Sequence, residues 1–214
     1  MNIEKTIENL EKNNMQAFFV KDKKAALEKV KQLLNKGETV AVGGSVTLNE
    51  TEVLSLLKSG DYNFLDRYKE GLTPDEIDDI FRKSFFADTF LSGTNAITEN
   101  GELYNVDGNA NRIAAILFGP KSVIIVAGIN KIVPDLSHAV ERVKEIAAPK
   151  NCKRLNKNTY CSKEGKCLKA SYQAEGMCMG CGSADRICCD YAICSYQRIK
   201  GRIKVIIVDE PLGF

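Results

Sequence analysis

The chain has 214 residues, of which 44% are hydrophobic and 27% are charged, a composition typical of a soluble globular protein. The N-terminus leads into a charged amphipathic stretch, and no apolar run approaches the roughly 18 residues that a membrane span needs. We therefore expect a cytoplasmic protein with no membrane span. The formal net charge is only +2, so the charge of the whole chain says little about its partners.

In chain order, the spacing of apolar residues predicts helix 3–10, strand 18–20, helix 26–34, strand 39–42, helix 53–57, strand 62–65, helix 73–85, strands 89–91, 103–106 and 122–126, helix 136–147 and strand 203–208. Thr73, Pro74 and Glu76 form a capping-box start for the fourth helix. The long helix at 136–147 is expected to end before Pro149, because proline has no N–H group to donate.

Strands that alternate with helices predict an α/β fold, with a mostly parallel sheet that has helices on both faces. We expect one domain, residues 1–214. The last strand, 203–208, should rejoin the sheet. Residues 152–195 would then be a cysteine-rich insertion before that strand.

All eight cysteines lie within this insertion, at Cys152, Cys161, Cys167, Cys178, Cys181, Cys188, Cys189 and Cys194. Structural disulfides are rare in the reducing cytoplasm, so this clustering favours a metal site. No histidine lies between Asn156 and Ser195, so the predicted ligands are thiolates. Thiolates suit iron–sulphur clusters and structural zinc alike, and free or redox-active thiols are a third interpretation. Cys189 beside Cys188 is interpreted as a spare packing residue.

Positive charge is also concentrated in this part of the chain. Residues 150–204 hold 12 Lys and Arg against 4 Asp and Glu, whereas the rest of the chain holds 18 against 24. These cations could offset the thiolates of a metal site or hold an anionic ligand near it. Nucleic-acid binding is the least favoured explanation, because interleaved basic and aromatic residues are sparse.

Polar and glycine residues follow three of the predicted strands, and ligands of parallel sheets bind at the carboxyl ends of strands. The candidate ligand-binding residues are Gly43, Gly44, Ser45, Gly93, Thr94, Asn95, Asp107, Asn109, Asn111 and Arg112. The turn at 43–45 could bind a phosphate or carboxylate through backbone N–H groups, or be a tight turn in which Ser45 caps a helix. Arg112 could clamp a carboxylate. The alternative is that these residues only build turns.

Three stretches of the sequence, residues 42–48, 87–112 and 201–214, resemble the LUD (lactate-utilisation) domain family. The resemblance implies a fold similar to the sugar-phosphate isomerase and CoA-transferase superfamily, and a role in lactate oxidation to pyruvate in bacteria. It also implies an iron–sulphur cluster, of the 4Fe–4S type, held by Cys161, Cys167, Cys181 and Cys188. Extra residues between Cys167 and Cys181 make Cys178 the alternative third ligand.

Three hypotheses about function follow. The first is oxidation of lactate or another 2-hydroxy acid, with a small carboxylate in the crevice and a redox partner subunit. The second is a CoA-transferase-like or isomerase-like enzyme with a structural metal, in which Glu99 is the catalytic nucleophile or base, as in transferases of similar fold. The third is a non-catalytic module with structural zinc. A homodimer that completes the site is left open, and a solvated loop position is the alternative for Glu99.

Overall fold

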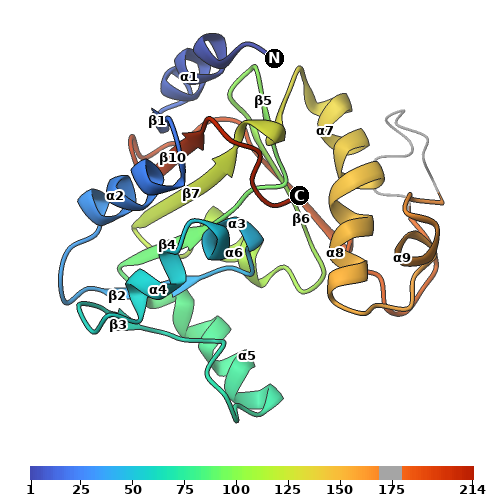
Figure 1. Ribbon diagram of the computed structural model, residues 1–214, viewed down its shortest axis with the longest axis horizontal. Coiled ribbons are helices and arrows are strands. Elements are labelled where there is room, and N and C mark those ends of the chain that lie inside the picture. Colours follow the sequence, from blue (N-terminus) through green and yellow to red (C-terminus); the bar gives the residue numbers. More distant parts are fainter. Residues whose placement is uncertain (169–179) are drawn as a thin grey trace.

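The computed structural model describes residues 1–168 and 180–214, and its largest element is a six-stranded sheet (Figure 1). All neighbouring strands in this sheet are parallel. Their order is β1 (Gln16–Val20), β10 (Ile203–Val208), β7 (Ser122–Gly128), β4 (Thr89–Ser92), β2 (Thr39–Val42) and β3 (Asn63–Phe64). The predicted α/β class is therefore confirmed, and the last strand rejoins the sheet between β1 and β7.

Both faces of the parallel sheet are covered, as the long apolar runs of its strands predict. Alternate residues of β7 point to opposite sides, Val123 and Ile125 into one apolar core and Ile124 and Val126 into another. The second of these cores is closed by α2 (Lys23–Leu33), α3 (Val46–Glu50) and α4 (Val53–Leu57). The first is closed by α1 (Ile3–Lys12), α6 (Asn111–Leu117) and residues of the second sheet.

That second sheet is a difference from the sequence prediction, which assigned strand 103–106 to the parallel sheet. It contains β8 (Ile132–Val133), β5 (Ala96–Thr98), β6 (Leu103–Asp107) and β9 (Asp190–Cys194), in that order. A four-residue turn joins β5 to β6, and so short a connection allows only antiparallel pairing. The end of the cysteine-rich segment is thus part of the fold, because β9 pairs with β6.

The helix predicted to stop before Pro149 continues through it. α7 (Leu136–Arg142) is followed by a π-helical turn, Val143–Ala147, and then by α8 (Ala148–Arg154). In this turn Ala148 N donates to Val143 O. The wider turn lies directly before Pro149, and it accommodates a residue that has no N–H group to donate. Figure 1 shows α7 and α8 as one column beside the second sheet.

The remaining helices are short and lie at the periphery. α5 (Pro74–Lys83) begins with the predicted capping box and runs into a 3₁₀ turn at Ser84–Phe86. α9 (Tyr160–Glu164) follows α8 and packs against it. In residues 1–168 and 180–214, no helix has both the length and the apolar character needed to cross a lipid bilayer.

The β5–β6 turn holds helix α1 against the body of the protein. Asn9 Nδ2 donates to Glu99 O at 2.7 Å, and Asn13 Nδ2 donates to Gly101 O at 2.9 Å. Gly101 has a φ of +79°, and a Cβ added there would lie 2.4 Å from the carbonyl carbon of Asn9. The close approach of α1 therefore requires glycine at this position.

We predict that Gly101→Ala is strongly destabilising, whereas Gly37→Ala is a matched control. Gly37 has a φ of +80° with nothing within 4 Å of the added Cβ, so it carries the same backbone strain without the collision. Strain alone costs about 1 kcal/mol, and overpacking adds roughly 1–3 kcal/mol. Urea unfolding of both variants measures the difference. Equal losses would show that α1 does not pack as described.

Candidate functional site

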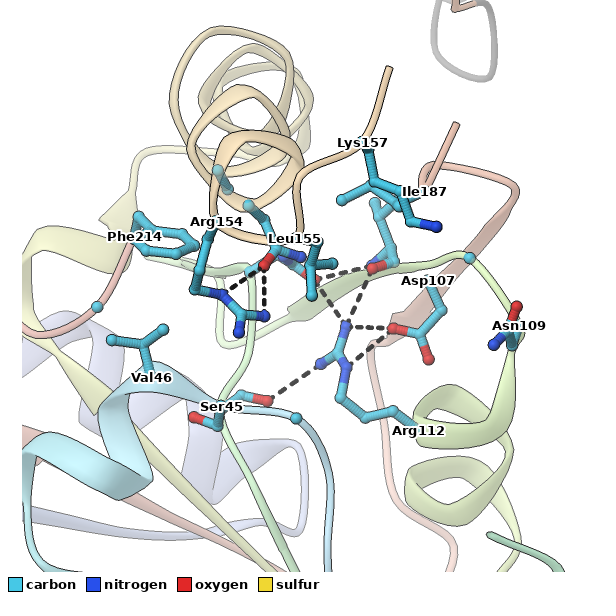
Figure 2. Close-up of a pocket in the computed structure, with 18 of the residues that line it drawn as sticks. Ser45, Val46, Asp107, Asn109, Arg112, Arg154, Leu155, Lys157, Ile187 and Phe214 are labelled. Carbon is cyan, nitrogen blue, oxygen red and sulfur yellow. Dashed lines mark hydrogen bonds and ion pairs between the residues drawn. The ribbon is translucent and has the colours of Figure 1, made fainter. Parts of the chain in front are cut away.

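A polar cavity of about 530 Å³ lies at the carboxyl ends of the parallel strands. The segments after β2, β4 and β7 reach it with Ser45, Gly93 and Lys131, and the end of α8 contributes Arg154. Figure 2 shows Ser45, Arg112 and Arg154, which come from separate segments, facing one space. Of the ten predicted ligand-binding residues, nine line this cavity: Gly44, Ser45, Gly93, Thr94, Asn95, Asp107, Asn109, Asn111 and Arg112.

Gly43, the tenth, lies behind the wall. A Cβ added to Gly43 would come within 2.9 Å of Arg112 Cγ and Ser92 Oγ, so the missing side chain lets Arg112 lie across the end of β2. Ser45 Oγ accepts a hydrogen bond from Leu48 N and caps the five-residue helix α3. The capping interpretation of the 43–45 turn is therefore supported, although Gly44 and Ser45 also line the cavity.

Arg112 is the centre of the cavity wall (Figure 2). Its Nε donates to Asp107 Oδ1 at 2.9 Å, and the ion pair with the same oxygen measures 2.7 Å from Nη2. Nη1 donates to Asn105 Oδ1 and Gly93 O, and Nη2 donates to Asn95 Oδ1 and Val106 O. The five N–H donors of a guanidinium are thus used within the protein. Arg112 organises the site, and a carboxylate clamp has to come from another residue.

Asp107 extends this network into helix α6. Its second oxygen, Oδ2, accepts from Ile113 N at 2.8 Å and so caps the first turn of α6. Ala110, directly before that helix, has a φ of +55°. Because side chains other than glycine rarely adopt this conformation, the Asp107–Arg112 contacts hold a strained turn beside the cavity.

Two cations of the cavity were missed in the sequence. Lys131 is buried, and the hydrogen bond from its amino group to Thr47 Oγ1 measures 3.1 Å. Burial, together with Arg142 and Arg112 nearby, lowers the pKa of Lys131 to about 7. Arg67 stacks on Phe81 with its guanidinium carbon 4.4 Å from the ring centre, and burial lowers its pKa. Among the described residues neither cation has a carboxylate partner.

The signal for both residues was present, because each follows a predicted strand by two or more residues. Lys131 comes after strand 122–126 and Arg67 after strand 62–65. What the sequence did not show is that these two segments turn inward at the strand ends.

The structure does not bring Glu99 to the cavity. This side chain accepts hydrogen bonds from Asn2 N at 2.8 Å and from Lys5 Nζ at 3.4 Å, at the start of α1. Partial desolvation raises the pKa of Glu99, but these hydrogen bonds outweigh it and hold the pKa below its usual value. A carboxylate in this position stabilises the helix start and is a poor proton acceptor.

A second, smaller cavity of about 20 Å³ is lined by Cys161, Cys167, Cys181 and Cys188 together with residues of α7 and β6. These are the four cysteines that the resemblance implies as ligands, and they come from separate segments of the chain. Cys178 lies outside the described residues. Cys189 is exposed and lines the large cavity, whereas Cys152 and Cys194 are buried.

Cysteine thiolates are ligands of both structural zinc and iron–sulphur clusters. Four thiolates around one zinc ion lie roughly 4 Å apart, since each Zn–S bond is about 2.3 Å. In the described part of the chain, no three Cys, His, Asp or Glu side chains are arranged to hold one metal ion. An iron–sulphur cluster places its thiolates around a larger body. The donor set fits such a cluster, but the space as it stands is smaller, so the thiols would have to separate around it.

Residues 184–189 form a common wall of the two cavities. Ala184, Asp185, Arg186 and Ile187 line the large cavity, and Cys188 lines the small one. Arg186 Nη2 donates to Cys188 O at 2.6 Å and lies 3.7 Å from Cys188 Sγ. Cys189 N also donates to Asp107 O, so this wall is attached to the Arg112 network.

We predict that Arg112→Gln lowers the free energy of unfolding by about 3–5 kcal/mol, because it leaves Asp107 buried without its partner. The control is Arg82→Gln, which breaks the exposed pair Asp78–Arg82 on α5 and should cost less than about 0.5 kcal/mol. Chemical denaturation followed by circular dichroism measures both. A loss at Arg112 as small as that at Arg82 would contradict the organising role.

The comparisons with known proteins agree with this fold. A family model described as LUD domain matches residues 3–208. A DUF162 family protein from Deinococcus radiodurans has 17% identity and a TM-score of 0.52, covering 96% of this chain and 95% of its own. A structure of eIF2B beta from Chaetomium thermophilum has 15% identity and a TM-score of 0.35, over 51% of this chain and 42% of its own. No curated protein matches the sequence. Because the family model covers nearly all of the sequence, the chain belongs to the LUD domain family.

Proposed function

We propose that this LUD-domain protein binds a small organic anion, a 2-hydroxy or 2-oxo carboxylate, in the large cavity, beside an iron–sulphur centre held by Cys161, Cys167, Cys181 and Cys188. Its role would be in the oxidation of lactate or a related 2-hydroxy acid in the bacterial cytoplasm. The reducing conditions there keep the thiols available as ligands.

The charge balance of the cavity carries the proposal. Two acidic side chains line it, Asp107 and Asp185, against six cationic ones: Arg67, Arg112, Lys131, Arg154, Lys157 and Arg186. Asp107 is neutralised by Arg112, and Asp185 lies 4.0 Å from Lys157. The excess of positive charge favours an anionic ligand. Three of these cations belong to the basic segment 150–204, which supports the anion-binding explanation of that segment.

The common wall at 184–189 supports a link between the ligand and the thiols. Oxidation of a 2-hydroxy acid to a 2-oxo acid releases two electrons and two protons. An iron–sulphur centre supplies electron transfer when bound, one electron at a time. The second acceptor has to come from outside the described residues, so we include a redox partner subunit in the proposal. The transferase hypothesis receives less support, because Glu99 lies at α1 and not in the cavity.

Anion binding is tested with L-lactate, pyruvate and 2-oxoglutarate by isothermal titration calorimetry. We expect Arg67→Met to weaken the tightest of these ligands by roughly tenfold, because a charge-assisted hydrogen bond contributes about 1.5–3 kcal/mol. Arg82→Met, which removes a cation from the exposed face of α5, should leave the affinity unchanged. Equal affinity in the wild type and Arg67→Met would rule out Arg67 as a residue that binds the anion. No binding of any anion would rule out the proposal.

The thiolate centre is tested by anaerobic purification followed by iron, zinc and acid-labile sulphide analysis. Cys188→Ser should lose iron and sulphide, whereas the adjacent Cys189→Ser should keep them, because only Cys188 lines the small cavity. The same loss is expected for Cys161→Ser and Cys167→Ser. Comparing Cys181→Ser with Cys178→Ser identifies the third ligand. Stoichiometric zinc without iron would contradict the cluster, and no metal at all would contradict the site.

A further inference from the structure

Lys131 is a cation of the cavity whose deep burial is not explained by anion binding alone. Its side chain is 4% exposed, yet it lines the cavity. Arg112 is neutralised by Asp107. Glu50, which accepts a hydrogen bond from Gly213 N, is near enough to raise the pKa of Lys131 slightly, but among the described residues no carboxylate lies within ion-pair distance of its amine. A buried ammonium group without a counterion in direct contact is costly, so the fold keeps this amine at the expense of stability.

Two glycines lie beside the amine at the cavity wall. A Cβ added at Gly93 or at Gly213 would lie 3.5 Å from Lys131 Nζ. Each of these positions borders the cavity. The same added Cβ atoms would lie 2.9 Å from Ser45 Oγ and 2.7 Å from Thr47 Oγ1, so the two glycines let these hydroxyl groups lie close to the amine at the cavity wall. The hydroxyl group of Thr47 lies 3.1 Å from the nitrogen, on the α3 side.

The protonation state of the amine suits nucleophilic chemistry. Desolvation is the main cause of a pKa of about 7, and the positive charges of Arg142 and Arg112 lower it further. Near neutral pH a substantial share of the molecules therefore carries the free amine, which is the nucleophilic form. An ordinary surface lysine is almost entirely protonated at this pH.

We propose that Lys131 forms a reversible imine with the carbonyl carbon of a 2-oxo carboxylate bound in the cavity. This inference rests on the proposed anion site and narrows its ligand to the 2-oxo acids. The cationic lining attracts the carboxylate, and the cavity wall formed by Gly93, Lys131 and Gly213 places the amine where it can meet the adjacent carbonyl group.

The step is balanced without a further reactant. The lone pair of Nζ attacks C2 and forms the C–N bond, while the carbonyl oxygen takes a proton and becomes the hydroxyl of a carbinolamine. That hydroxyl then leaves as water when the C=N bond forms. No electrons are exchanged with another group. Thr47 Oγ1 is within hydrogen-bond distance of Nζ and can pass the proton from nitrogen toward the departing oxygen.

The test uses the full chain, purified anaerobically, with pyruvate as the probe. The protein is equilibrated with pyruvate at pH 6, 7 and 8, pulsed with sodium borohydride and analysed by peptide mass spectrometry. We expect a reduced pyruvate adduct on Lys131, with a yield that rises several-fold from pH 6 to pH 8 as the amine loses its proton. Lys131→Met should give no adduct in this peptide.

Two further measurements keep the outcomes distinct. L-Lactate has a hydroxyl in place of the keto group at C2, so it should form no adduct but should protect Lys131 from pyruvate in the wild-type protein, a result that needs no variant. Calorimetry shows in parallel whether pyruvate binds. Binding without enrichment of the adduct at Lys131 over surface lysines overturns the imine and leaves the anion site standing. Absence of binding overturns both.

Discussion

The buried ion pair between Arg112 and Asp107 holds the functional end of this protein together. Arg112 reaches the segment after β4 through Gly93 and the end of β6 through Asn105, while Asp107 caps α6. Gly43 leaves room for the arginine at the end of β2. A buried pair of this kind adds little net stability, but losing one partner is costly. Its effect is to fix the relative positions of segments from both sheets, and the cavity exists only while they are fixed.

All N–H donors of Arg112 bond within the protein, so other cations of the cavity are the ones available to bind a ligand. Parallel strands deliver their following loops to one edge of a sheet, and here the loops after β3 and β7 supply Arg67 and Lys131. The wall at 184–189 brings the thiols close to the same space, since Arg186 contacts both Cys188 and the large cavity. Ligand binding and the state of the thiols therefore share one short segment, which gives the proposed centre a physical route to the ligand.

The sequence predicted the parallel sheet, the return of the last strand and nine of the residues around the cavity, because strand periodicity and the strand-end rule depend on local patterns. It did not predict the second sheet, since the pairing of β6 with β9 joins residues more than 80 positions apart. Nor did it predict the helix through Pro149, which depends on a π-helical turn. The sequence pattern assigned Arg112 to ligand binding. Its five acceptors within the protein could not be predicted, because they lie on segments that only the fold brings together. Lys131 and Arg67 were overlooked for the same reason.

We propose that the cavity at the strand ends binds an anion and that Lys131 reacts with it. A crystal structure of the anaerobically purified protein grown with pyruvate tests this most directly. We expect ligand density in the cavity lined by Gly93, Lys131 and Gly213, with the C2 atom joined to Lys131 Nζ and the carboxylate facing the cationic lining. Pyruvate bound elsewhere, or a cavity that holds only water at a saturating pyruvate concentration, would contradict it.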